Sequence, residues 1–309
     1  MILLRQMAIL FFYMLIGYVM ARKGLLKAEH SKLLSFLVVN IANPALILNG
    51  CFQCTEEISV SKIANILLLA CLIFVGLILL AMVMPRILRA KHGDFGSYRV
   101  MTLFSNIGFM GLPVISAAYG GIAVLYASIF LLPFNLLIYT YGIAQIREKT
   151  KKTTSERRVS SLLKKVCNIG VVACIAALVL CFFHVQLPEG VRSAVTGLSN
   201  LTAPLSMFVI GSSFCEISLR EMVMDIRLLV FSVLKLIVLP FVAMLLLRLF
   251  IQDAILLEVC YVLLAAPVGS MTAMLSKQYG GNTELTVKGV ALTTICSVVT
   301  IPLVAQWIL

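Results

Sequence analysis

Two apolar segments of the sequence carry glycine, proline and small polar residues, and these residues are the best candidates for chemistry. The segments run from Phe104 to Gly121 and from Leu264 to Gly281, and both end in Tyr-Gly-Gly. The candidate site residues in them are Ser105, Asn106, Gly108, Gly111, Pro113, Pro267, Gly269, Ser270 and Thr272. Without a neighbouring histidine or carboxylate to activate them, such hydroxyls and amides are suited to binding a ligand, not to catalysis.

Proline and glycine should interrupt each segment at membrane depth. Proline lacks an amide donor and clashes with the preceding turn, while glycine relaxes the backbone. We therefore expect two half-helices in each segment, with the N-terminus of one pointing at the membrane centre and carrying roughly half a positive charge. A kinked helix with glycine at a packing interface would explain one such segment. Two such segments at equivalent positions in the two halves of the sequence favour a shared anion site.

Other polar residues in apolar runs could complete such a site. Asn40 and Asn43 lie close together in one run, and Asn200 and Thr202 do so in another. Their side chains either cap the broken helices or face a substrate, and the sequence leaves both open. Asn106 is the preferred direct ligand, because its amide can donate a hydrogen bond to a carboxylate.

One basic residue, Lys235, is placed well inside an apolar run. It follows Arg227 by eight residues, about 12 Å along a helix, which is near the reach of a lysine side chain to water. It is either a counter-charge for an anion, or a titrating group, or a side chain that snorkels to the cytoplasmic face. The sequence does not decide between these.

The composition identifies an integral membrane protein. Hydrophobic residues make up 61% and charged residues 12%, whereas soluble domains have about 25% charged residues. The net charge of +12 comes from basic residues scattered between apolar runs, which indicates membrane topology and no nucleic-acid partner. Acidic residues avoid the middle of the runs, and His30, His92 and His184 lie in loops or at their ends. This argues against a proton pump or cation antiporter.

Windows of about 20 apolar residues predict an all-α membrane protein with ten transmembrane helices. The predicted spans are Ile2 to Ala21, Leu33 to Phe52, Ile63 to Met84, Val100 to Ala118, Ile122 to Ile146, Val166 to Val185, Ala194 to Cys215, Leu228 to Phe250, Ala254 to Ser276 and Leu285 to Ile308. Lysine and arginine concentrate in the loops after odd-numbered spans. By the positive-inside rule these loops are cytoplasmic, so both termini of this multi-pass protein face outward from the cell membrane.

The sequence also predicts two inverted repeats. Tyr119 and Tyr279 are 160 positions apart, and an Asn-x-x-x-Pro pattern recurs in spans 2 and 7 at the same offset. The predicted units are residues 1–146 (spans 1–5), a basic cytoplasmic linker at 147–165, and residues 166–309 (spans 6–10). An odd number of spans per unit inverts the second relative to the first.

Residues Asn106 to Pro113, NIGFMGLP, resemble the N-x-G-F-x-G-x-P crossover of the auxin efflux carrier family. Ala266-Pro267-x-Gly269 and Ser276-Lys277-x-Tyr279 are similar to its second crossover. The resemblance extends over essentially the whole chain and implies crossing broken helices 4 and 9, a scaffold domain and a moving transport domain. It also implies that Asn106 binds substrate and that Pro113 and Pro267 are crossover prolines.

The resemblance implies a permease or efflux carrier of organic anions such as malate, malonate or an auxin-like carboxylate. The short central loop is typical of the compact prokaryotic form and differs from the long insert of the plant members. A sodium-coupled organic-anion symporter of the bile-acid type is the alternative, followed by a receptor without transport. An enzyme is not expected.

No cofactor or metal is expected, because the Cys51–Cys54 pair has no further ligands nearby. A disulfide between these two cysteines stays open. The expected partners are the organic anion and the lipid bilayer, and a homodimer is also left open.

Overall fold

The computed structural model describes residues 2–52, 59–146, 169–183, 185, 187–216 and 224–308. The predicted linker at 147–165, Cys54 and His184 lie outside these residues. In the described part of the chain the regular structure is helical, with one isolated β-bridge. The α-helices are α1 (Ile2–Arg22), α2 (Ala28–Leu37), α3 (Asn43–Phe52), α4 (Val60–Ile87), α5 (Phe95–Leu103), α6 (Leu112–Tyr119), α7 (Gly121–Leu137), α8 (Ile143–Ile146), α10 (Ile169–Phe182), α11 (Glu189–Ser199), α12 (Thr202–Ser213), α14 (Ile226–Val233), α15 (Leu239–Leu247), α16 (Ala254–Ala265), α17 (Ser270–Tyr279) and α18 (Thr283–Ile308).

Short turns of different pitch join several of these helices. The 3₁₀ turns are η2 (His92–Asp94) and η5 (Phe214–Glu216), and the π-helical turns are η1 (Val38–Ala42), η3 (Ile107–Gly111), η4 (Ile138–Gly142) and η6 (Leu234–Val238). Three of the π turns end two residues before a proline, namely Pro44, Pro113 and Pro240. Proline cannot donate to the carbonyl four residues back and its ring clashes with it, so a wider turn relieves the clash.

Seven continuous helical stretches among the described residues are long and apolar enough to cross a membrane. They are Leu3–Arg22, Ala28–Phe52, Val60–Ile87, Gly121–Ile146, Glu189–Ser213, Ile226–Leu247 and Thr283–Trp307. Three shorter apolar helices, Ile107–Tyr119, Ile169–Phe182 and Ala254–Ala265, fall within predicted spans 4, 6 and 9. Spans 4 and 9 are short because they contain the interrupted segments. The prediction of an all-helical membrane protein is therefore confirmed for the described residues.

The outer face of α4 is apolar, as a lipid-facing helix requires. Leu68, Leu72, Val75 and Leu79 recur every three or four residues and are each more than half exposed. The opposite face buries Ala70 and its neighbours against α5 and α7. A continuous exposed apolar stripe of this kind suits contact with lipid.

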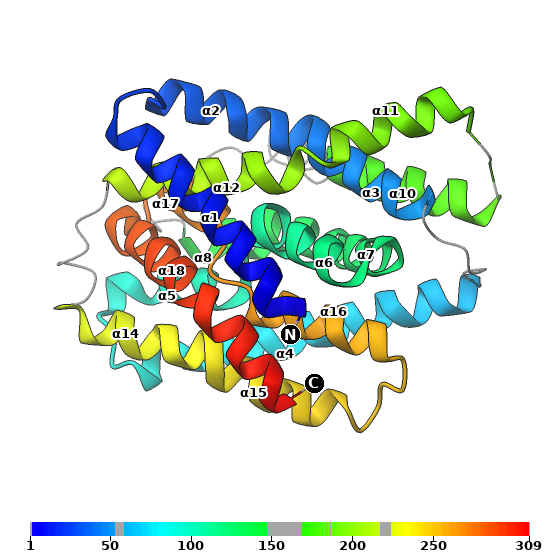
Figure 1. Cartoon of the computed structure of the whole chain (residues 1–309). Helices are drawn as coiled ribbons and strands as arrows, with labels where there is room; N and C mark the ends of the chain where they lie inside the picture. The colour runs from blue at the N-terminus through cyan, green and yellow to red at the C-terminus, as the bar shows by residue number, and fades with distance from the viewer. Residues whose placement is uncertain are drawn as a thin grey trace, which may run out of the picture.

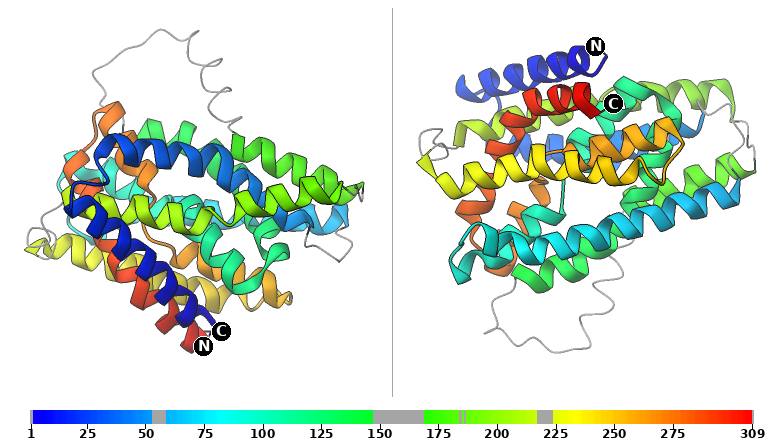
Figure 2. Two further views of the ribbon diagram at one scale, coloured as in Figure 1. Left: turned by 45° about the horizontal axis from the view of Figure 1, so that its top comes forward. Right: turned by 90° about the horizontal axis from the view of Figure 1, so that it is seen from below.

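The helices form two packed groups with the interrupted segments at their border. In Figure 1, α2, α3, α11 and α12 run along the top, α4, α14 and α15 run along the bottom, and α6 and α7 lie between them. The three views of Figures 1 and 2 place the two ends of the chain near each other, where α1 and α18 are in contact. Contacts of α7 with α3 and α10, of η3 with α12, and of α1 with α6 join the two groups.

Glycine allows α1 and α12 to pack closely. A Cβ atom built on Gly17 of α1 would lie 2.5 Å from the carbonyl oxygen of Phe208 in α12, and one built on Gly211 would collide with the Met14 backbone. Small residues bring membrane helices together in this way, since apolar packing alone gives little drive in lipid. These glycines fix one edge of the group formed by α1, α2, α3, α10, α11 and α12.

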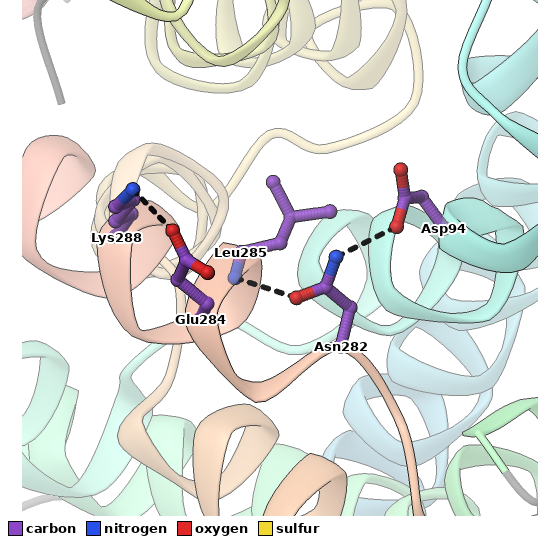
Figure 3. Close-up of polar contacts among 5 residues, drawn as sticks. All are labelled: Asp94, Asn282, Glu284, Leu285 and Lys288. Atoms are coloured by element: carbon purple, nitrogen blue, oxygen red, sulfur yellow. Dashed lines mark hydrogen bonds and ion pairs between the residues drawn. The ribbon is translucent and has the colours of Figure 1, made fainter. Parts of the chain in front are cut away.

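A polar contact ties the two interrupted segments together beyond their ends (Figure 3). Asn282, which precedes α18, donates from Nδ2 to Oδ1 of Asp94 at 2.8 Å, and its own Oδ1 accepts the Leu285 amide at 3.0 Å. Asp94 leads into α5, the helix that precedes the first interrupted segment. Asn282 follows α17, the last half of the other. The side chain of Asn282 therefore links the helix before one interrupted segment to the end of the other.

Candidate functional site

The two interrupted segments cross at their breaks and hydrogen-bond to each other there. α5 ends at Leu103 and α16 ends at Ala265, and each is followed by a short extended stretch. The amide of Asn106 donates to the Pro267 carbonyl at 2.7 Å, and the amide of Gly269 donates to the Phe104 carbonyl at 2.9 Å. These two bonds make the isolated antiparallel bridge between Ser105 and Val268. Each segment thus supplies the partners that the other lost when its helix broke.

The crossing needs glycine and a hydroxyl at defined places. A Cβ atom at Gly269 would lie 3.0 Å from the Ser105 carbonyl oxygen and 3.3 Å from that of Phe104, so a side chain there would press on the bridge. The Val268 amide, which points away from the bridge, donates to Oγ1 of Thr293 on α18 at 3.1 Å. This bond and the two bridge bonds satisfy backbone groups of the crossing inside the protein, as the bilayer interior demands.

The second half-helices begin immediately after the crossing. The Oδ1 atom of Asn106 accepts the Phe109 amide at 3.3 Å and so caps η3, which continues into α6. Pro113 is the second residue of α6, directly after the π turn that makes room for its ring. In the other segment α17 starts at Ser270, and Thr272 donates from Oγ1 to the Gly269 carbonyl at 2.7 Å. Two helix N-termini therefore lie next to the crossing, each with partial positive charge.

Asn106 keeps an unused hydrogen-bond donor in the interior. The residue is 4% exposed, and its Nδ2 atom has no partner among the described residues. Because Oδ1 caps the Phe109 amide, the nitrogen is the end of the side chain that remains available. A buried donor without a partner costs about 1 to 3 kcal/mol, so this atom indicates a position where water or a ligand completes the hydrogen bonding.

Three further polar atoms without partners are buried on the elements that face η3. They are Oδ1 of Asn43, at the start of α3, and the hydroxyls of Thr202 and Ser206 on α12. Asn43 reaches the crossing segment directly, because its Nδ2 donates to the Gly108 carbonyl at 3.1 Å. α12 packs against η3 over several residues. The border between α12, α3 and η3 thus concentrates unpaired polar groups at membrane depth.

Lys235 does not snorkel to water. Its side chain is fully buried, and its Nζ donates to the Ser105 hydroxyl at 2.8 Å and to the Thr102 carbonyl at 3.1 Å. The turn that carries it, η6, precedes Pro240. The lysine is therefore part of the crossing itself. Of the interpretations from the sequence, a counter-charge and a titrating group remain.

The structure does not bring all predicted residues to the crossing. Asn40 donates from Nδ2 to the Phe36 carbonyl of its own helix at 2.9 Å. Asn200 is exposed at the turn between α11 and α12, where it lines an open hollow that also includes Arg192. Gly111 packs against the Leu263 side chain and serves helix contact. The described contacts of these three residues are thus structural.

Sequence reasoning missed Thr293, which holds the Val268 amide. Ser206 is already suggested by its place beside Asn200 and Thr202 in one apolar run, and its buried hydroxyl has no partner among the described residues. Thr293 is a hydroxyl residue inside an otherwise apolar span, which is the signal that could have found it. Hydroxyls at such positions are common in membrane helices, where they usually bond to their own backbone.

A cysteine of another helix lies next to Cys51, and a bond between Cys51 and Cys54 stays an open expectation. Cys51 at the end of α3 lies beside Cys181 of α10, with the two sulfur atoms 2.7 Å apart. Cys54 lies outside the described residues. A search of those residues for clusters of histidine, cysteine and carboxylate finds no metal-binding group.

Apolar helices of membrane length, together with two broken helices that cross and bond in the interior, define a polytopic membrane protein with a discontinuous core. Sequence comparison makes this specific. The family described as membrane transport protein matches residues 2–305, and the chain belongs to this family, that of the auxin efflux carriers.

Relatives match over nearly the full length. An uncharacterized transporter of Methanocaldococcus jannaschii is 28% identical over 308 residues, covering 96% of this chain and 95% of that protein. An uncharacterized transporter of Methanothermobacter thermautotrophicus is 23% identical over 295 residues, covering 94% and 93%. The resemblance noted at the crossover residues is therefore confirmed as family membership.

If the crossing binds a dicarboxylate such as malonate, Asn106→Asp should weaken that binding about tenfold or more. The substitution keeps an oxygen to cap the Phe109 amide but replaces the unpaired Nδ2 donor, and a hydrogen bond to a charged group is worth about 1.5 to 3 kcal/mol. Asn40→Asp is the matched control, because Asn40 bonds to its own helix. Titration calorimetry on the purified variants gives the comparison. Equal malonate affinity in the two variants would remove Asn106 from the site.

Proposed function

We propose that the protein is a secondary carrier of small organic anions, such as malate, malonate or an auxin-like carboxylate, that works by alternating access around the crossing helices. The observation that carries the proposal is the unpaired Nδ2 of Asn106, buried beside the helix N-termini of η3 and α17. A donor and two positive helix ends at one place suit a carboxylate. Membership of the membrane transport family supports the transport of that ligand.

We also propose ten spans in two inverted repeats, residues 1–146 and 166–309, joined by the linker 147–165. The two bridge bonds support this, since an offset of 163 turns the bond from Asn106 to Pro267 into the bond from Gly269 to Phe104. Gly120 and Gly280, which end the segments with positive φ, are 160 positions apart. The first segment therefore has three more residues between bridge and glycine than the second.

Alternating access in this proposal is a movement of one helix group past the other. Asn106 belongs to the group with α4 to α8, whereas Asn43, Thr202 and Ser206 belong to the group with α1 to α3 and α10 to α12. A substrate held between the two groups would satisfy unpaired atoms from both. Displacing the crossing relative to α12 would then open the site to one side of the membrane and afterwards to the other.

The orientation that we propose places both termini outside the cell and the central linker in the cytoplasm. The support is the excess of lysine and arginine in loops after odd-numbered spans. A reporter inserted between residues 150 and 155 should signal the cytoplasm, and reporters at the two termini the exterior. If the linker and the termini report the same side, the span count is wrong.

Flux into proteoliposomes tests the proposed function most broadly. Purified protein should accelerate counterflow of labelled malate or malonate, and unlabelled carboxylates should compete. Uptake that requires a sodium gradient would point to a symporter of the bile-acid type. Binding without any flux would point to a receptor. Neither binding nor flux with mono- or dicarboxylates would contradict the proposal.

A further inference from the structure

The ammonium group of Lys235 occupies a position that the broken helix creates. In a continuous helix the Thr102 carbonyl would accept the amide of Asn106, four residues on. That amide donates to Pro267 in the other segment, so the Thr102 oxygen loses its helical partner. The Nζ of Lys235 takes its place at 3.1 Å and also donates to the Ser105 hydroxyl at 2.8 Å.

The two oxygen atoms that Nζ contacts are of the kind that can coordinate a sodium ion. They are a carbonyl at the C-terminal end of the half-helix α5, where the helix dipole is negative, and a hydroxyl in the unwound stretch. In transporters with discontinuous helices, carbonyls at such ends coordinate the coupling sodium ion. The lysine brings a positive charge to these oxygens from a separate helix, through a turn next to Pro240.

The negative C-terminal end of α5 favours the charged form of Lys235, whereas complete burial opposes it. The side chain is completely buried, and both contacts described for Nζ are to uncharged oxygens. The described ion pairs, Lys62 with Asp253 and Lys288 with Glu284, lie elsewhere. The charge of the lysine is thus compensated by the helix end and the hydroxyl, the same groups that would stabilise a bound cation.

We propose that Lys235 is a built-in cation that takes the place of a coupling sodium ion at the crossing. It holds the α5 end and Ser105 in the shape that the bridge requires, and it makes the carrier independent of sodium. The role of Lys235 in ion coupling rests on the proposed transport function. Its occupancy of the cation position is independent of that function and can be tested on the purified protein without any substrate.

Thermal unfolding of the purified full chain provides that test. Wild-type protein should melt within about 1 °C in sodium, potassium or choline chloride at equal ionic strength, since a ligand that does not bind cannot stabilise. Lys235→Ala should melt lower in choline chloride. It should regain about 5 °C or more with sodium ions or with propylammonium, which replaces the atoms that the substitution removes.

Lys277→Ala is the matched control, because Lys277 is an exposed residue of α17. It should respond to the cations as wild type does. A sodium-specific rise in the wild-type melting temperature would overturn the proposal, and so would a Lys235→Ala protein that responds to neither sodium nor propylammonium.

A second variant keeps the proposal testable if Lys235→Ala does not fold. Lys235→Met retains the length of the side chain but fills the space, so propylammonium should give no recovery. If the wild-type protein transports malonate, Lys235→Met should lower the flux about tenfold or more, equally in sodium and choline. Undiminished flux would contradict the role of the charge. Absent wild-type flux would instead count against the proposed function and leave the melting test in force.

Discussion

The structure depends on a requirement of the bilayer, which is that every backbone amide and carbonyl must find its partner inside the protein. A helix that breaks in the interior leaves backbone groups unpaired, so neither of the two broken helices could meet this requirement alone. Crossing lets the amide of Asn106 and the amide of Gly269 each reach a carbonyl of the other segment. Thr293 and Lys235 satisfy the groups that remain next to the bridge. The crossing is therefore a unit in which neither segment can hold its shape alone.

Three prolines explain where continuous helices widen into π-helical turns. Pro44, Pro113 and Pro240 each follow a π-helical turn, and these turns carry or adjoin the residues at the crossing border: Asn43 follows η1, Gly108 is in η3 and Lys235 is in η6. A missing amide frees a carbonyl and widens the turn. The same chemistry that weakens the helix thus positions polar groups at membrane depth. In the proposed function Asn43 meets the substrate, whereas Lys235 holds the end of α5.

Much of this could be predicted from the sequence, because glycine, proline and apolar length act locally. The second break falls at Pro267 and Gly269, as the sequence predicts. The first falls at Phe104 to Asn106, ahead of Gly108, Gly111 and Pro113, which lie in the helical stretch that follows. Contacts between distant segments could not be predicted in the same way. Nothing local distinguishes Asn40, which bonds to its own helix, from Asn43, which reaches Gly108. From the sequence, the side chain of Lys235 is long enough to snorkel to water. Only the packing of η6 against the crossing shows that this side chain turns inward.

Competition binding between a carboxylate and its amide isostere tests the central claim most directly. Two helix N-termini at about 0.3 to 1 kcal/mol each when exposed, and up to about 2 when partly buried, should favour the anion about tenfold to several hundredfold. Malonate should therefore displace a labelled dicarboxylate at a concentration at least about tenfold below that needed for malonamide. Equal displacement by the two compounds would contradict an anion site at the crossing of these helices.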